Sequence, residues 1–272
     1  MRIINTYEEI ISLLNEMNGV FDIHLWEKYA SRISNDFPQK LKHDSRNYDF
    51  NNDILPIINL VMSGFEKLKM ANNSFIKSTD RLDERIKNAI GIELQVDIIF
   101  CLGLCNGAGW ATKLNKNFVV LLGVEKIIEL GWYDFEKLSA LIYHELGHIW
   151  QDTVSGLQGE DGLTQLYREG VAMYFEQLMA GDFNYYHQNK NGWLDWCHAN
   201  KNTLNTEYLR RLKTGENTQE FFGDWLNYQG YSDVGYYIGC EFIKWLSERY
   251  PINELAKLDR DMVYQEFENF VG

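Results

Sequence analysis

The sequence predicts a mostly helical α+β fold in which a small sheet lies in the first half of the chain. Residues 94–104 and 118–122 are dense in Val, Ile, Leu and Phe, as buried strands are. Most of the remaining chain carries apolar residues at helical spacing. Hydrophobic residues make up 45% and aromatic residues 14% of the 272 positions, so the chain has the composition of a globular protein with a substantial core.

Before the first predicted strand the pattern indicates helices. They are expected at residues 6–17, 22–34 and 53–70, with a shorter one from Thr79 or Asp80 to about Ile90. Thr6 is the expected N-cap of the first helix, because Glu9 follows at the capping-box position. Residues 35–52 are polar and rich in turn formers, and we expect a loop there.

A glycine-rich stretch follows the first predicted strand. Gly107–Thr112 is a candidate edge strand, and Lys113–Asn117 would form the turn into the next strand. An edge strand presents unpaired N–H and C=O groups along the free side of a sheet. The alternative, an ordinary glycine-rich connection, stays open from the sequence.

The segment Tyr143–Trp150 contains the pattern H-E-x-x-H. On a helix that begins after the N-cap Asp134, His144 and His148 lie one turn apart and leave the same face, so both imidazoles can reach one metal ion. Glu145 lies about 100° further round, where it can contact a water molecule beside the metal. The flanking residues are apolar, which favours a buried metal site over two solvated histidines. Zinc is the expected metal because imidazole suits it.

A third ligand is expected about twenty residues after His148. The segment 167–176 is helical by composition and lies between Gly162 and Gly181. Glu169 is the favoured ligand, because the small neighbours Gly170 and Ala172 would let this helix approach the first one closely. Glu176 is the alternative, with an outer-shell or solvated role expected for it.

H-E-x-x-H followed about twenty residues later by E-G-x-A resembles the gluzincins, the zinc peptidases with a His, His, Glu metal site. Within them the chain is most similar to a bacterial family of predicted zinc-dependent proteases. The resemblance covers His144–Glu176 and, more loosely, Gly235–Gly239. It implies a zincin-like fold, with a small twisted sheet whose edge strand lies next to the H-E-x-x-H helix, followed by a helical C-terminal part.

The resemblance also implies residue roles. His144, His148 and Glu169 would hold Zn²⁺, and Glu145 would be the general base that activates water for peptide hydrolysis. Tyr236 matches the family's glycine-tyrosine segment and would stabilise the negative oxygen of the transition state. The chain departs from the family at Cys240, where a second aromatic residue is usual.

Composition limits the partners and the compartment. The formal net charge of −13 argues against nucleic acids and anionic membrane surfaces as partners. The N-terminus lacks a signal-peptide profile, and no apolar run is long enough to span a membrane. Four cysteines without C-x-x-C spacing are expected to be buried free thiols, although Cys101 and Cys105 could form a metal pair. We therefore expect a cytoplasmic protein.

No repeat, low-complexity tract or Gly/Ser linker marks a firm domain boundary. We expect one zincin-like catalytic unit over residues 1–272, with a soft division into 1–150 (N-terminal helices, sheet and H-E-x-x-H helix) and 151–272 (the helical part with the third ligand). The predicted function is zinc-dependent hydrolysis of a peptide or protein substrate. The alternatives are a non-catalytic zinc-containing binding or regulatory protein with a vestigial site, and a metal-free structural protein.

Overall fold

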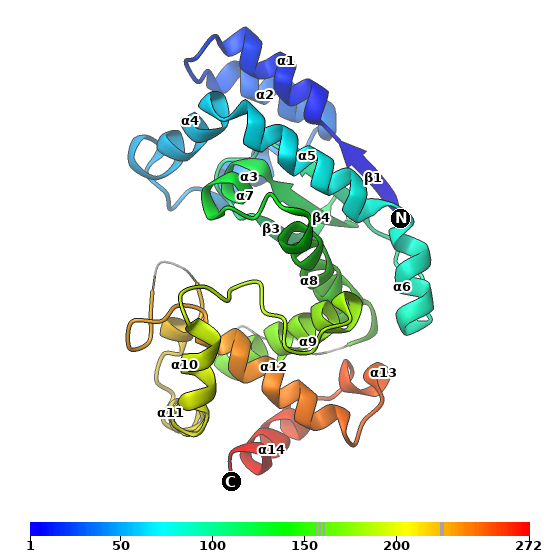
Figure 1. The fold of residues 1–272 in the computed structure, drawn as a ribbon, viewed down its shortest axis with the longest axis vertical. Coiled ribbons are helices and arrows are strands. Elements are labelled where there is room, and N and C mark those ends of the chain that lie inside the picture. The colour runs from blue at the N-terminus through cyan, green and yellow to red at the C-terminus, as the bar shows by residue number, and fades with distance from the viewer. Residues whose placement is uncertain (156, 158, 160, 224–225) are drawn as a thin grey trace. The chain divides into compact units, whose positions relative to one another are not determined.

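The computed structural model describes residues 1–155, 157, 159, 161–223 and 226–272. The fold is α+β and mostly helical with a small sheet, as the sequence predicted; 63% of it is helical, and the sheet is mixed and has four strands. The chain divides into two compact units, Met1–Glu145 and Leu146–Gly272. The division falls inside helix α8 (Phe135–Val154), which runs through it without interruption (Figure 1).

The first unit contains the sheet and most of the early helices. Its helical elements are α1 (Tyr7–Met17), α2 (Ile23–Ile33), α3 (Phe37–Asp44), the π-helix η1 (Phe50–Ile54), α4 (Leu55–Ser63), α5 (Phe65–Thr79), α6 (Leu82–Ile90) and α7 (Val124–Leu130). Its strands are β1 (Arg2–Asn5), β2 (Asp97–Cys101), β3 (Gly109–Leu114) and β4 (Asn117–Gly123).

The strands are ordered β1-β2-β4-β3 across the sheet. β2 pairs in parallel with β1 and with β4, whereas β3 and β4 form an antiparallel hairpin. The hairpin turns through Asn115 and Lys116, both with left-handed φ values, as a two-residue type I′ turn requires. β3 is therefore an edge strand, which confirms the edge strand predicted near Gly107–Thr112, displaced by two residues at each end.

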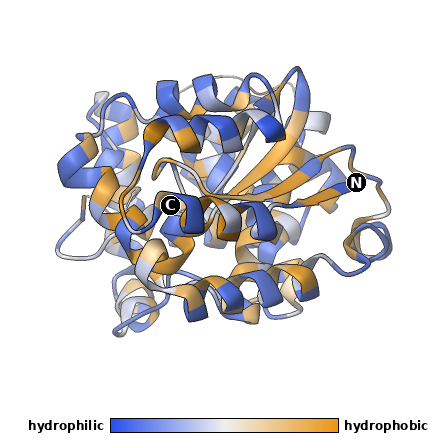
Figure 2. Cartoon of the chain, turned by 90° about the horizontal axis from the view of Figure 1, so that it is seen from above, coloured by the Kyte–Doolittle hydropathy of each residue, from blue (hydrophilic) through white to orange (hydrophobic). Residues whose placement is uncertain are grey.

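The two central strands, β2 and β4, form the apolar centre of the first unit (Figure 2). β2 and β4 are largely buried, and Phe100 of β2 stacks on Phe75 of α5 with ring centroids 5.1 Å apart. α5 in turn contacts the start of α8 through a 2.7 Å hydrogen bond between the hydroxyls of Ser78 and Ser139. The sheet and α5 together fix the N-terminal part of α8.

Thr6 immediately precedes α1 but does not cap it with its side chain. Its hydroxyl donates to the Phe100 carbonyl oxygen at 2.7 Å and lies 2.7 Å from the Tyr29 hydroxyl. The capping-box prediction with Glu9 was therefore wrong. The hydroxyl instead bonds to Phe100 of β2 and Tyr29 of α2, because β1 leads directly into α1 beside β2.

Two predictions for the N-terminal helices were also wrong. The helix expected over 53–70 is two helices that divide at Gly64, where a Cβ would lie 2.5 Å from the carbonyl oxygen of Leu60. The loop expected over 35–52 contains α3, whose Phe37 and Leu41 are fully buried. In α3 tertiary burial of an apolar face outweighs a weak local preference for helix.

The second unit is helical. After α8 it contains α9 (Gly162–Ala180), α10 (Trp193–Ala199), α11 (Lys201–Thr214), the 3₁₀ helix η2 (Gln219–Phe221), α12 (Val234–Ser247), α13 (Ile252–Leu255) and α14 (Arg260–Val271). Asp161 caps α9 by accepting a hydrogen bond from the Thr164 N–H, and Gly181 ends it in a left-handed conformation. Both ends of α9 agree with the glycine boundaries seen in the sequence.

α9 and α12 lie side by side and cross at two glycines (Figure 1). A Cβ on Gly170 would lie 2.4 Å from the carbonyl oxygen of Gly239, and one on Gly239 would lie 2.5 Å from the carbonyl oxygen of Leu166. Only hydrogen atoms fit at this crossing, so these two glycines set the distance between the helices.

None of the helices within the described ranges combines the length and the apolar character that a membrane crossing requires.

Replacing Gly170 with Ala is expected to lower the free energy of unfolding by about 1–3 kcal/mol, because the added methyl group meets backbone atoms that have no rotamer to change. Urea denaturation followed by circular dichroism measures the change. Thr203→Ala, at an exposed position of α11, is the control and should stay within about 0.5 kcal/mol of the unsubstituted protein. Equal denaturation midpoints for the two variants would contradict the close crossing.

Candidate metal centre

α8 carries the H-E-x-x-H residues in a largely buried stretch. Asp134 caps the helix by accepting a hydrogen bond from the Lys137 N–H at 2.9 Å, as predicted. His144 is 4% exposed and Glu145 is 6% exposed, and the apolar residues around them are buried as well. Polar side chains at this depth are costly unless they have polar or ionic partners.

Gly147 lets α9 approach α8 closely. A Cβ at Gly147 would lie 2.9 Å from the Ala172 Cα and 3.1 Å from the Phe175 Cβ. Ala172 therefore has the role predicted for it. Gly170 does not, because it faces Gly239 of α12 instead.

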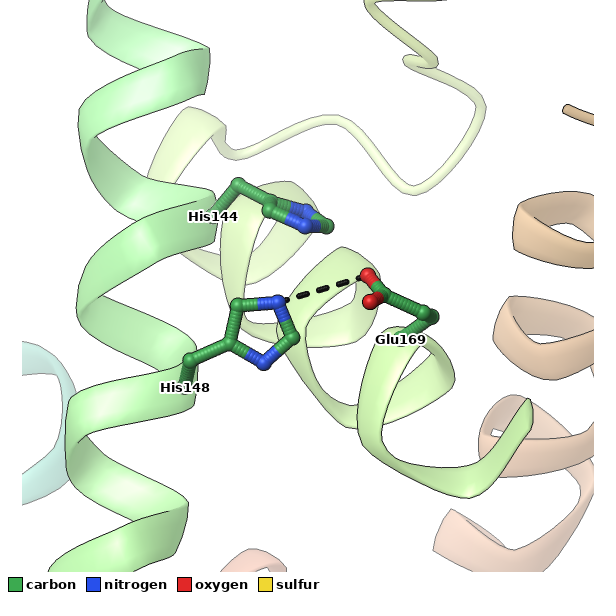
Figure 3. Close-up of side chains that lie close together, drawn as sticks. All are labelled: His144, His148 and Glu169. Carbon is green, nitrogen blue, oxygen red and sulfur yellow. Dashed lines mark ion pairs between the residues drawn. The ribbon is translucent and has the colours of Figure 1, made fainter. Parts of the chain in front are cut away.

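This close approach brings the three predicted ligands together. His144, His148 and Glu169 each offer a ligand atom, and these atoms all lie within 4.8 Å of one another. The Nε2 atom of His148 is 3.3 Å from a carboxylate oxygen of Glu169 (Figure 3). His148 and Glu169 are half-buried, whereas His144 is buried.

The donor set fits a zinc ion. Nitrogen and oxygen ligands bind zinc at about 2.0–2.2 Å, so two ligand atoms of a tetrahedral site lie about 3.3–3.5 Å apart. The His148–Glu169 separation of 3.3 Å agrees with this value. Two imidazoles and one carboxylate are also the donor set of a catalytic zinc site, which keeps one position for water.

Glu176 belongs to a second polar cluster. It is 0% exposed, so the solvated role considered for it was wrong. Its carboxylate oxygens lie 2.8 and 3.0 Å from Nδ1 of His187, which is 8% exposed in the segment after α9. Ligand atoms of His144, Glu176 and His187 also lie within 4.8 Å of one another. Sequence spacing gave no signal for His187, because its segment is irregular.

Glu145 contacts the edge strand. Its Oε2 atom accepts a hydrogen bond from the Ala111 N–H of β3 at 2.7 Å. The contact requires close packing, because a Cβ on Gly109 would lie 3.0 Å from both the Glu145 Cγ and the Leu141 Cδ1. The sequence indicated a sheet edge near the H-E-x-x-H helix, but not which backbone group meets the carboxylate.

Tyr236 and Tyr237 occupy different environments on α12. Tyr237 is 1% exposed and packs among aromatic rings, including those of Tyr186 and Trp193. Tyr236 is half-buried, with its ring 5.6 Å from that of Phe222 in an edge-to-face arrangement. Tyr237 therefore belongs to the core, and Tyr236 is the more accessible of the two.

All four cysteines are buried free thiols, as predicted. Burial raises the pKa of Cys101 and of Cys105, and the nearby Glu125 carboxylate raises both further. Thiolate is the form that binds metals, so neither residue suits a metal pair. Burial likewise raises the pKa of Cys240 to about 12.

In comparisons with protein-family models, curated proteins and solved structures, no match to this chain was found.

Replacing His187 with Ala is expected to cost about 1–3 kcal/mol in unfolding free energy, because the fully buried Glu176 carboxylate loses its bonds to the imidazole. His198→Ala is the matched control, since His198 is an exposed histidine of the same unit. Chemical denaturation of the two variants provides the comparison. The buried pair would have no structural role if both lost the same stability.

Proposed function

We propose that this protein is a zinc-dependent peptidase with a gluzincin-like site on a zincin-like fold, and that His144, His148 and Glu169 hold Zn²⁺. The observation that carries the proposal is the convergence of the three donors, with the His148 and Glu169 ligand atoms 3.3 Å apart. Two of the donors come from one helix and the third from another, so their meeting is a property of the folded chain.

Glu145 is the proposed general base. It neighbours a proposed ligand in the sequence but leaves the helix about 100° away from it, as a group that contacts water beside the metal must do. The zinc ion would polarise the scissile carbonyl group and lower the pKa of a bound water. Glu145 would take the proton of the attacking water and deliver it to the leaving amine.

The substrate proposed for this site is an extended peptide or a segment of a protein. β3 is an edge strand, so it can pair with an added strand, and its glycine and alanine residues give a backbone room to approach. A net charge of −13 disfavours nucleic acids and anionic membrane surfaces as ligands. Four buried free thiols suit the reducing cytoplasm, which is the proposed compartment.

Tyr236 is the proposed donor to the oxygen that becomes negative during hydrolysis. It lies three residues before Gly239, so the two share one face of α12. Gly239 contacts Gly170, the residue that follows Glu169. Tyr236 therefore lies on the side of α12 that carries Gly239, and its half-buried ring packs edge-to-face with Phe222.

The second candidate is a non-catalytic zinc-containing binding or regulatory protein. It is favoured by Cys240, which stands where the resembled family has an aromatic residue. The thiol is fully buried, so it offers the site no exposed donor.

Replacing Glu145 with Gln is expected to keep the zinc and to reduce peptide hydrolysis by about 10²–10⁴-fold, the usual contribution of a general base. The measurement is turnover of a peptide library by zinc-loaded protein, with zinc content determined on the same sample. Glu136→Gln is the matched control, because Glu136 lies exposed in the first turn of the same helix.

If the Glu145→Gln variant hydrolysed peptides at the rate of the control, Glu145 would not be the general base. Zinc retained by an unsubstituted protein that cleaves no peptide would instead favour the non-catalytic candidate.

His148→Ala and Glu169→Ala are each expected to lower bound zinc well below one equivalent, because either change leaves two protein donors. Elemental analysis after dialysis against a weak chelator measures the stoichiometry. His198→Ala and Glu248→Ala change the same residue types elsewhere in the second unit and should keep one equivalent. A full equivalent in the His148 or Glu169 variant would show that the changed residue is not a ligand.

A further inference from the structure

The N–H group of Ala111 points away from the sheet. Gly123 donates to the Ala108 carbonyl oxygen at 2.9 Å, which makes this pair a hydrogen-bonded one of the antiparallel hairpin. Hydrogen-bonded and non-hydrogen-bonded pairs alternate along such a ladder, so the registered pair Ala111↔Val120 is a non-hydrogen-bonded one. The backbone groups of Ala111 therefore face outward, along the free edge of β3.

At that edge the Ala111 N–H already has a hydrogen-bond acceptor within the chain. It donates to Oε2 of Glu145 at 2.7 Å, the length of a charge-assisted hydrogen bond. Gly109, two residues earlier on the same strand face, leaves the space that the carboxylate stem occupies. A Cβ at position 109 would lie 3.0 Å from side-chain atoms of Leu141 and Glu145, so these side chains would have to shift.

We propose that Ala111 is a positioning residue for the general base, through its backbone N–H, and that this N–H is not a substrate contact. The inference rests on the proposed function. With Oε2 held by the strand, the other carboxylate oxygen of Glu145 is left to exchange the proton with water and the leaving amine. An added peptide strand then pairs with the outward N–H and C=O groups of Gly109, two residues before Ala111 along the edge.

The edge position makes a backbone test possible. Ala111→Pro removes this single N–H, and no β3–β4 hydrogen bond is lost, because proline is tolerated where the N–H of an edge strand faces outward. Lys113→Pro is the matched control: its N–H has the same outward orientation, but Glu145 does not accept from it. Zinc content, thermal stability, kcat and KM are measured for both variants.

We expect Ala111→Pro to lower kcat by about tenfold to a hundredfold relative to Lys113→Pro, as misplacement of a catalytic group does. KM and zinc content should match those of the control. A raised KM at unchanged kcat would make the Ala111 N–H a substrate contact and overturn the proposal. Equal kcat values for the two proline variants would also overturn it.

A second measurement detects the hydrogen bond between Ala111 and Glu145 without an activity assay. In protein labelled with ¹⁵N-alanine, the Ala111 amide signal is identified by its loss in Ala111→Gly. Glu145→Ala should move this signal upfield and speed its hydrogen exchange, whereas Glu136→Ala should leave it unchanged. An Ala111 signal that does not respond to Glu145→Ala would overturn the proposal, including when Ala111→Pro fails to fold.

The two hypotheses fail in different ways. Unsubstituted, zinc-loaded protein that cleaves no peptide contradicts the peptidase proposal, and the amide measurement still decides whether Ala111 holds Glu145. Cleavage by the unsubstituted protein together with an unresponsive amide signal contradicts only the positioning role of Ala111.

Discussion

The close approach of α8 and α9 is the constraint on which the site depends. Gly147 lies between the two motif histidines in the sequence, and its missing side chain is what allows Ala172 to reach the α8 backbone. One turn of α9 before Ala172, Glu169 then has its carboxylate within reach of His148. A methyl group at position 147 would meet the Ala172 Cα at 2.9 Å, so α9 and its Glu169 would have to move away from α8.

The polar interior of the second unit is built around these helices. Glu176 lies two turns after Glu169 on α9, and the segment after that helix supplies His187 to it. Further bonds hold the segment to α9, including one from the Gln177 side chain to the Tyr185 carbonyl oxygen at 2.7 Å. A fully buried carboxylate is costly unless its oxygens are satisfied. The irregular segment therefore packs against α9, because its His187 supplies hydrogen bonds to the buried Glu176 carboxylate.

In the first unit the buried carboxylate of Glu125 holds the segment that connects β2 to the edge strand β3. Glu125 accepts hydrogen bonds from the N–H groups of Gly103 and Cys105 at 2.8 and 3.0 Å, between β2 and β3. Burial raises its pKa, and the two backbone bonds oppose that shift. Cys105 holds a left-handed conformation there, with φ of 60°. The strand that follows runs along the free edge of the sheet and meets Glu145 at Ala111.

The sequence by itself determined the class of fold and the helix that carries His144 and His148, because both follow from local periodicity. It named Glu169 as the favoured third donor and left the sheet edge at Gly107–Thr112 as one of two alternatives. The sequence misassigned α3, the Thr6 cap and Gly170, which depend on what other elements supply. Only the tertiary structure decided that Gly147 and Ala172 form the α8–α9 contact, that His187 reaches Glu176, and that the Ala111 N–H meets Glu145. These contacts join segments distant in the chain, and no spacing along a sequence encodes which backbone or side-chain group will face another after packing.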